Sequence, residues 1–460
     1  MFENYRIIHF VGIGGIGMSG IAEVLHNLGY EVTGSDIRAS QNTKRLEALG
    51  IKVYIGHRAE NVDNAHVVVI SSAIKDDNPE VVEARKRGIP IIPRAEMLAE
   101  LGRLKYSVLV AGAHGKTTTT SLIASVFSHA DMDPTVVIGG RLKATGSNVR
   151  LGQGEFLIAE ADESDGSFLK LSPTVAVATN IDREHMDYFK TMDALCAAFR
   201  EFLDKVPFYG LAVVCADNLY LRNIKEELHR RTISYGFTDY ADVRAYNVEF
   251  SGYGMRFLVN YKGEDLGEFS IPLIGEHNVL NALAAITVSR ELFIEVEKIR
   301  QALKEFSGIQ RRFEFKGQFQ GARIYDDYGH HPTEIRATLE SISRVVSGRT
   351  VVVFQPHRYT RTRDLFGEFV TAFDKADRLY LLDIYPAGER PIEGVSSEAL
   401  YNEMRKHHKA VCYYQDREAL IGELRDILKE GDLMITLGAG DVWKIAEELV
   451  QKRDDESAGT

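Results

Sequence analysis

The chain is poor in the residues that mark secreted, membrane-embedded or nucleic-acid-binding proteins. Its 460 residues include only three cysteines, and their spacing fits neither a disulfide framework nor a metal site. No apolar run approaches the roughly 20 residues of a membrane span, and the N-terminus lacks an apolar signal core. The net charge of −11, from 55 basic and 66 acidic residues, argues against nucleic-acid binding. We therefore expect a cytoplasmic protein that binds neither membrane nor nucleic acid and buries its three thiols, Cys196, Cys215 and Cys412.

Strand-like and helix-like patterns alternate along most of the chain. At about 150 residues per domain, its length suggests three domains, and the pattern places them at 1–104, 105–309 and 310–460. Strands separated by helices imply parallel sheets, so the fold class is α/β. Short alternating runs between glycine turns predict antiparallel strands appended to the central domain, near 243–250, 255–261 and 268–273. The principal strands are expected near 7–13, 31–36, 67–72, 106–110, 135–139, 156–161, 175–180, 211–215, 322–327, 350–355, 378–384, 410–414 and 432–437.

A phosphate-binding loop is predicted where the second series of strands begins. The apolar run 106–110 leads into Gly112-Ala-His-Gly-Lys-Thr-Thr118, and a helix-compatible segment follows. In such a loop, backbone N–H groups hold phosphate oxygens, Lys116 reaches the outer phosphates and Thr117 ligates Mg²⁺. Val110 stands where a full motif of this kind has glycine. The alternative is a glycine-rich turn with an exposed lysine, and in both cases replacing Lys116 should change stability little.

A second glycine-rich loop lies near the N-terminus. The apolar run 7–11 leads directly into Gly12-Ile-Gly-Gly-Ile-Gly17, and Asp36 ends the next strand-like run. This spacing is typical of a dinucleotide site, with glycines at the pyrophosphate and an acid at a ribose. NAD and a UDP-sugar both satisfy the motif, and NAD is the commoner ligand. A glycine turn that binds nothing is the third possibility.

Polar groups gather where several predicted strands end. Glu160-Ala-Asp-Glu-Ser-Asp165 carries four carboxylates beside the predicted phosphate loop, where one acid is well placed for Mg²⁺. His185 follows the next strand. Asp326-Asp-Tyr-Gly-His-His331 and Gln355-Pro-His-Arg-Tyr-Thr-Arg361 end two strands of the third domain, and their basic groups could bind carboxylate or phosphate. A solvated acidic loop and a histidine without ligand are the simpler interpretations of the first two features.

Taken in order, these motifs resemble those of the Mur ligases of peptidoglycan synthesis over nearly the whole chain. The resemblance rests on 12–20, 113–118, 160–165, Asn180 with His185, 275–278, 311–313, 326–331 and 354–359. It implies a Rossmann-like N-terminal domain, a central P-loop ATPase-like domain and a Rossmann-like C-terminal domain. It also implies an ATP-dependent ligase that joins L-alanine to the carboxylate of UDP-N-acetylmuramate through an acyl phosphate, in the synthesis of cell-wall precursors.

The resemblance also implies roles for individual residues, with Mg²⁺ as the metal and Mn²⁺ as the alternative. Lys116, Thr117, Glu160, His185 and His330 would be catalytic, and Thr117, Glu160 and His185 would hold metal. ATP would meet Gly112, Ala113, His114, Gly115, Lys116, Thr117, Thr118, Asn278, Asn281, Arg312 and Asp327. The UDP-sugar would meet Gly14, Gly15, Ile16, Gly17, Asp36, Ser71 and Ser72, and the amino acid Tyr328, His357 and Arg358. Because the ATP residues come from two domains, domain closure would be part of catalysis.

Two other functions share some of these motifs. A ligase that attaches a recycled murein peptide to UDP-N-acetylmuramate would differ only in its amino-acid pocket. A nicotinamide-dependent dehydrogenase would explain the first glycine loop but would leave Lys116, Thr117 and the third domain without a role. Several Mur ligases hold a second metal with a carbamylated lysine, and no lysine of this sequence can be picked out for that task.

Overall fold

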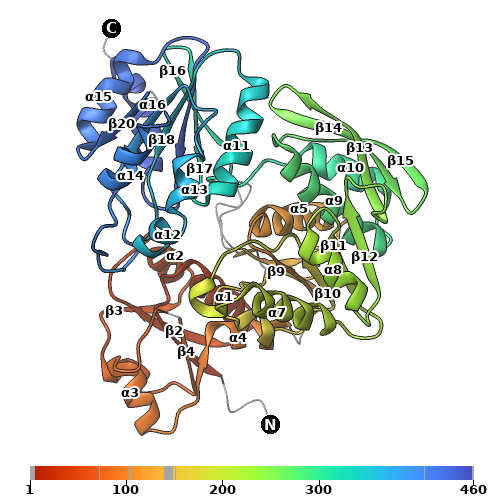
Figure 1. Ribbon diagram of the computed structural model, residues 1–460. Coiled ribbons are helices and arrows are strands. Elements are labelled where there is room, and N and C mark those ends of the chain that lie inside the picture. Colours follow the sequence, from red (N-terminus) through yellow and green to blue (C-terminus); the bar gives the residue numbers. More distant parts are fainter. Residues whose placement is uncertain are drawn as a thin grey trace. The chain divides into compact units, whose positions relative to one another are not determined.

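The computed structural model describes residues 6–71, 73–102, 105–138, 149–150, 152–408 and 410–457, and within them it forms three β-sheets with flanking helices (Figure 1). Contacts group the chain into two compact units. The first contains the chain up to Asn247 together with Phe257–Phe269 and Val279–Ser307, and the second contains Val248–Arg256, Ser270–Asn278 and the chain from Gly308 onward. The division into three domains at 104/105 and 309/310 stays a prediction.

The N-terminal sheet is parallel and has the strand order β3-β2-β1-β4-β5. The order reverses direction at β1, so the carboxyl ends of β1 and β4 lie at a topological switch point, where ligands of open α/β sheets bind. The short half-exposed elements α2 and β3 were not predicted from the sequence. The elements are β1 (Ile7–Val11), α1 (Ile16–Asn27), β2 (Glu31–Asp36), α2 (Gln41–Ala48), β3 (Lys52–Ile55), η2 (Ala59–Val62), β4 (Val67–Ile70), α3 (Pro79–Lys86), β5 (Ile91–Pro93) and α4 (Arg94–Gly102).

The central sheet is mixed and has the order β15-β14-β13-β12-β11-β10-β6-β9-β7-β8. Two-residue turns join β13 to β14 and β14 to β15, and such short connections require antiparallel neighbours. The appended antiparallel strands are thus confirmed, although the third begins at Glu264 rather than near residue 268. The strands are β6 (Tyr106–Ala111), β7 (Thr135–Val137), β8 (Val149–Arg150), β9 (Phe156–Glu160), β10 (Val175–Ala178), β11 (Leu211–Cys215), β12 (Thr232–Gly236), β13 (Val243–Ser251), β14 (Gly254–Tyr261) and β15 (Glu264–Ile271).

Three helices of this region, α5, α7 and α8, pack on the parallel part of the sheet, and α10 packs on α5. The helix α5 directly follows the predicted phosphate-binding loop, and most of its side chains are buried because it lies against β6, β9 and α10. The helices are α5 (Lys116–His129), η3 (Ser167–Lys170), α6 (Met186–Phe189), α7 (Met192–Asp204), α8 (Leu219–Glu227), α9 (Glu276–Glu291) and α10 (Val296–Lys304).

The C-terminal sheet has the order β16-β17-β21-β18-β19-β20, parallel except for the edge strand β16. Alternate residues of its strands build two cores. One faces α11, α13 and α14, and the other faces α15 and α16 (Figure 1). The elements are β16 (Glu314–Phe319), β17 (Ala322–Asp327), α11 (Pro332–Val345), β18 (Thr350–Phe354), α12 (Tyr359–Asp364), α13 (Phe366–Val370), β19 (Arg378–Leu382), α14 (Ser397–Met404), β20 (Val411–Tyr414), α15 (Arg417–Ile427), β21 (Leu433–Leu437) and α16 (Trp443–Ser457).

Part of the second unit's core comes from chain segments that precede β16 by many residues. Phe250 and Tyr253, at the β13–β14 turn, and Ile274, after β15, pack into the core that faces α11. The Arg323 guanidinium lies over the Tyr253 ring at 4.1 Å and over the Phe315 ring at 4.6 Å. Among the described helices, none is both long enough and apolar enough to cross a membrane.

Candidate active site

Two glycines set the path of the loop between β6 and α5. Gly112 has φ +142° and Gly115 has φ +81°, both in the region that side chains disfavour. A Cβ at Gly112 would lie 2.0 Å from Oγ1 of Thr179, and one at Gly115 would lie 2.5 Å from Oδ1 of Asn281. The loop delivers the chain into α5 at Lys116, and the first amides of a helix have no acceptor within it. This arrangement suits a bound phosphate.

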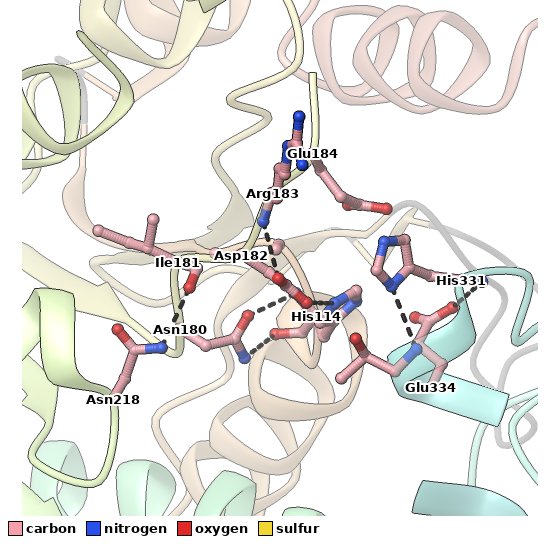
Figure 2. Close-up of polar contacts among 12 residues, drawn as sticks. His114, Asn180, Ile181, Asp182, Arg183, Glu184, Asn218, His331 and Glu334 are labelled. Carbon is pink, nitrogen blue, oxygen red and sulfur yellow. Dashed lines mark hydrogen bonds and ion pairs between the residues drawn. The ribbon is translucent and has the colours of Figure 1, made fainter. Parts of the chain in front are cut away.

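The residue that shapes this loop is Asn180, which follows β10. Its Oδ1 accepts a hydrogen bond from the His114 amide at 2.8 Å, and its Nδ2 donates to the His114 carbonyl at 2.9 Å (Figure 2). The His114 side chain pairs through Nε2 with Asp182 at 3.0 Å. Because Asn180 acts as a clamp on the backbone, it is a positioning residue that the predicted site had omitted.

Lys116 is not the exposed lysine that the sequence suggested. Its side chain is only 17% exposed, and its Nζ donates to both carboxylate oxygens of Glu163 at 2.8 and 3.0 Å and to the Gly112 carbonyl. Glu163 itself is 2% exposed. The expected exposure of Lys116 is therefore wrong. Because its replacement would leave a buried carboxylate without its partner, we now expect the replacement to lower stability.

The charges of this pair depend on each other. Burial opposes the charge of Lys116, but the carboxylate of Glu163 raises the lysine pKa above its ordinary value. Burial alone would raise the pKa of Glu163, but the Lys116 ammonium and a hydrogen bond from His185 lower it overall. Burial likewise opposes a charge on His185, yet Glu163 and Glu184 raise its pKa. The three groups form one coupled electrostatic cluster.

Two groups of predicted metal ligands lie near the loop. Glu160 ends β9 and is in register with Val110 of the neighbouring strand β6, and Thr117 lies in the first turn of α5. His185 precedes α6 with φ +57°, an uncommon conformation for a residue with a side chain. Its Nε2 lies 3.6 Å from Oε1 of Glu163 and 3.9 Å from Oε2 of Glu184.

These donor sets suit a divalent cation. One ligand atom each from Glu163, Glu184 and His185 lies within 4.8 Å of the others, and the three residues line one small hollow. Carboxylate oxygens with one imidazole nitrogen fit Mn²⁺ well, and carboxylates with a threonine hydroxyl fit Mg²⁺. Glu163 and Glu184 were not among the predicted ligands. Glu163 lies 22 residues before His185 in the sequence, and Glu184 lies immediately before it.

The N-terminal glycine loop lies at the switch point of its sheet. The amides of Gly12 and Ile13 donate to the Ser35 carbonyl, at 2.8 and 2.9 Å. The Gly14 amide donates to Oδ2 of Asp36 at 2.9 Å, and Asn42 of α2 donates to the Gly14 carbonyl. Asp36 therefore holds the loop in addition to any contact with a ribose.

Most other predicted UDP-sugar residues converge on the same edge. Ser71 follows β4 beside Gly12, where a Cβ would meet its Oγ at 3.1 Å. Gly15 lies in the turn between β1 and α1, and Gly17 lies against the side chain of Arg94, whose Nη1 is 3.2 Å from the Cβ position. Arg94 is a basic group that the predicted site lacked. Ser72 and the side chain of Ile16 lie outside the described residues.

The C-terminal sheet has its own polar edge. Asp327 ends β17 and accepts the amides of Gly329 and Phe313, both at 2.7 Å. Burial raises its pKa to about 6, against the opposing effects of Arg312 and these amides. The Tyr328 ring lies 5.1 Å from the Arg311 guanidinium and 5.3 Å from that of Arg312.

The predicted amino-acid residues are neighbours at this edge. The rings of His330 and His357 are 5.8 Å apart, and His357 stacks on Tyr385 at 5.6 Å. Burial and the charges of Arg361 and Arg358 lower the pKa of His357 to about 4, and burial with Arg361 also lowers that of His330. Arg358 immediately precedes α12 and has φ +71°. Both histidines are therefore neutral near pH 7.

Two arginines at this edge lie in predicted motifs but were not given roles in the predicted site. Arg361 donates towards Nδ1 of His357 at 3.3 Å, and Arg311 binds the carbonyls of Gly438 and Gly440 after β21. A glycine-rich turn after an apolar run, here 438–441, was the signal that could have identified this loop. Of the two asparagines predicted to meet ATP, Asn281 accepts from Thr119 at 3.1 Å and Asn278 donates to the Ile274 carbonyl at 2.8 Å.

Comparison with known proteins assigns a family to this architecture. Residues 7–106 match the Mur ligase family catalytic domain, residues 110–289 the Mur ligase middle domain, and residues 311–440 the Mur ligase glutamate ligase domain. These matches cover most of the chain, which therefore belongs to the Mur ligase family. The predicted α/β fold class is confirmed.

Relatives and solved structures agree with that assignment. The chain is 56% identical over 453 residues to a UDP-N-acetylmuramate–L-alanine ligase of Geotalea uraniireducens, covering 98% of this chain and 99% of that one. The corresponding Geobacter sulfurreducens protein is 53% identical over 458 residues, with 99% of each chain covered. The crystal structure of UDP-N-acetylmuramate-alanine ligase MurC from Thermotoga maritima superposes with a TM-score of 0.84 at 29% identity, covering 98% and 99% of the two chains. A murein peptide ligase from Psychrobacter arcticus shares the fold, with a TM-score of 0.71 at 23% identity and 96% and 98% coverage.

Proposed function

We propose that this Mur ligase joins L-alanine to the carboxylate of UDP-N-acetylmuramate at the expense of ATP. The observation that carries the proposal is the high identity, over nearly full length, to ligases named for these substrates. The geometry supports it, because one phosphate loop, one dinucleotide-type loop and one basic edge provide a place for each of the three substrates.

The central site is suited to transferring a phosphoryl group to a carboxylate. In that step two anions must approach each other, so positive charge has to screen them. Lys116 and the first amides of α5 supply such charge, and Thr117 and Glu160 would hold a Mg²⁺ that neutralises the phosphates. We assign Arg312, Asp327 and His330 to the same ATP as part of this proposal.

The C-terminal edge is suited to receiving an amino acid. Its arginines can bind the carboxylate. The amine of the amino acid must lose its positive charge before it attacks the acyl phosphate, and neutral imidazoles can accept hydrogen bonds from it. Nδ1 of His330 lies 3.0 Å from the Tyr328 carbonyl oxygen. Because a carbonyl can only accept, Nδ1 carries the proton and Nε2 is left as the acceptor. Tyr328, His357 and Arg358 are the proposed pocket.

The function is tested by phosphate release. The purified chain is mixed with ATP, Mg²⁺ and UDP-N-acetylmuramate, and then given L-alanine, a murein tripeptide or NAD in separate reactions. Release of phosphate with L-alanine and formation of the alanyl nucleotide, seen by mass spectrometry, are expected. Release only with the tripeptide would assign the chain to murein recycling, and reduction of NAD with some added substrate would favour a dehydrogenase.

A further inference from the structure

The contacts that Lys116 makes already use the N–H groups that would bind a nucleotide. An ammonium has three N–H donors, and Nζ is engaged by the two oxygens of Glu163 and by the Gly112 carbonyl. Contact between Lys116 and a phosphate oxygen therefore requires at least one of these three bonds to break, and an incoming anion competes most directly with the carboxylate of Glu163. The carboxylate of Glu163 thus occupies the place of an incoming anion.

Release of Glu163 creates a second problem. The carboxylate is 2% exposed, and a buried charge without a partner is strongly destabilising. It would also lie beside the polyanionic end of the nucleotide, and like charges at such short range repel. Some other positive charge must therefore replace Lys116 as its partner.

The available neighbours identify that partner. Oε1 of Glu163, which also accepts from Lys116, lies 3.6 Å from Nε2 of His185, and Glu184 approaches the same nitrogen. An imidazole alone could supply at most one charge for two carboxylates. A divalent cation held by Glu163, Glu184 and His185 balances both, with the oxygen and nitrogen ligands that Mg²⁺ and Mn²⁺ accept.

We propose that Glu163 is an exchangeable counter-ion, which pairs with Lys116 in the empty loop and binds a divalent cation with His185 and Glu184 when the nucleotide takes Lys116. The inference rests on the proposed ATP site and adds to it a positioning residue and a cation ligand set that needs no modified lysine. It makes nucleotide and cation binding mutually favourable, because each removes an obstacle to the other.

The test compares Glu163→Gln with Asp165→Asn. Glutamine has the size of glutamate and can still accept from Lys116, but it carries no charge. Asp165 lies in the same acidic run, is exposed, and caps the Ser167 amide, a contact that asparagine can retain. The first measurement is calorimetric titration with ATP in a chelator, without divalent cation. Glu163→Gln should bind ATP about tenfold more tightly than wild type, since one charged hydrogen-bonded pair no longer has to break.

The second measurement counts bound Mn²⁺ by electron paramagnetic resonance in the presence of a non-hydrolysable ATP analogue. Glu163→Gln should bind one Mn²⁺ fewer than wild type, and Asp165→Asn should match wild type in both measurements. Glu184→Gln should also lose one Mn²⁺, but without any gain in metal-free ATP affinity, because Glu184 does not hold Lys116.

The exchange of partners by Glu163, the cation ligand set and the proposed function are contradicted by different results. Unchanged or weaker metal-free ATP binding by Glu163→Gln would overturn the exchange, and so would an unchanged Mn²⁺ count in Glu163→Gln. If Glu163→Gln does not fold, an unchanged count in Glu184→Gln would overturn the cation set. Failure of wild type to bind ATP under any condition would instead overturn the proposed function.

Discussion

Replacing Lys116 with alanine should damage both catalysis and the central fold. The first effect follows from the loop: a donor to a transferring phosphoryl group is lost, and by comparison with oxyanion donors turnover at saturating ATP should fall by about 10²–10³. The second follows from Glu163, which would remain 2% exposed without the ammonium that donates to both of its oxygens. Breaking a buried pair on one side costs about 3–5 kcal/mol.

The two effects can be separated with a double variant. Hydrogen exchange followed by mass spectrometry on peptides from α5 and β9 reports the stability of this region alone, which avoids treating the whole chain as two-state. Lys116→Ala should exchange faster there. Lys116→Ala/Glu163→Gln, which removes the stranded charge, should recover most of the protection but none of the activity. Wild-type protection in the single variant would refute the buried-pair argument, and near-normal phosphate release at saturating ATP would refute the phosphate loop.

Two further substitutions and one titration test the other two polar edges. Gly14→Val should abolish UDP-N-acetylmuramate binding in calorimetry, because even its Cβ would lie 2.8 Å from Oδ2 of Asp36 and would displace the carboxylate that holds the loop. Tight NAD binding by wild type, without a response to the sugar nucleotide, would reverse the ligand assignment. His330→Ala should lower ligation while UDP-N-acetylmuramate affinity stays unchanged, since the two sites use different sheets; full activity would make the 326–331 motif structural. The imidazole of His357 should titrate near pH 4 in a ¹³C-histidine NMR series. Its folded pKa lies below the unfolded value, so its contribution to stability is present above about pH 6.5 and is lost as pH falls towards 4; titration at an ordinary pKa would show that Arg358 and Arg361 do not act on it.

The sequence predicted those elements whose residues show a clear pattern over a short stretch of chain. The strands at 31–36, 211–215 and 322–327 have the predicted limits, and both glycine loops and the strand ends carry the polar groups that the motifs suggested. Elements with little apolar pattern, such as β3 and β16, were not predicted, because their half-exposed residues show neither clear alternation nor a continuous apolar run.

The predicted site failed where contacts join distant residues. Among the four carboxylates at 160–165, local sequence does not distinguish the one that is buried against Lys116, which lies 47 residues earlier in the chain. The same holds for Asn180, whose clamp on His114 spans 66 residues. Arg94 was passed over because an isolated arginine has no local signature of function. Arg361 was included in the motif 355–361 but was given no role of its own, and only the folded chain shows that these two arginines border a loop and a histidine.

The contributions of Phe250, Tyr253 and Ile274 to the core beside α11 have a practical consequence for dissecting the enzyme. An expression fragment that begins at residue 310 would lack all three side chains, and the faces of Tyr325 and Arg323 that Tyr253 covers would meet water. Such a fragment should be prone to aggregation, because an uncovered apolar face invites association. On the ribosome, too, the nascent chain makes these pieces long before the sheet that receives them, so the C-terminal unit reaches its final packing only when segments made far apart in time come together.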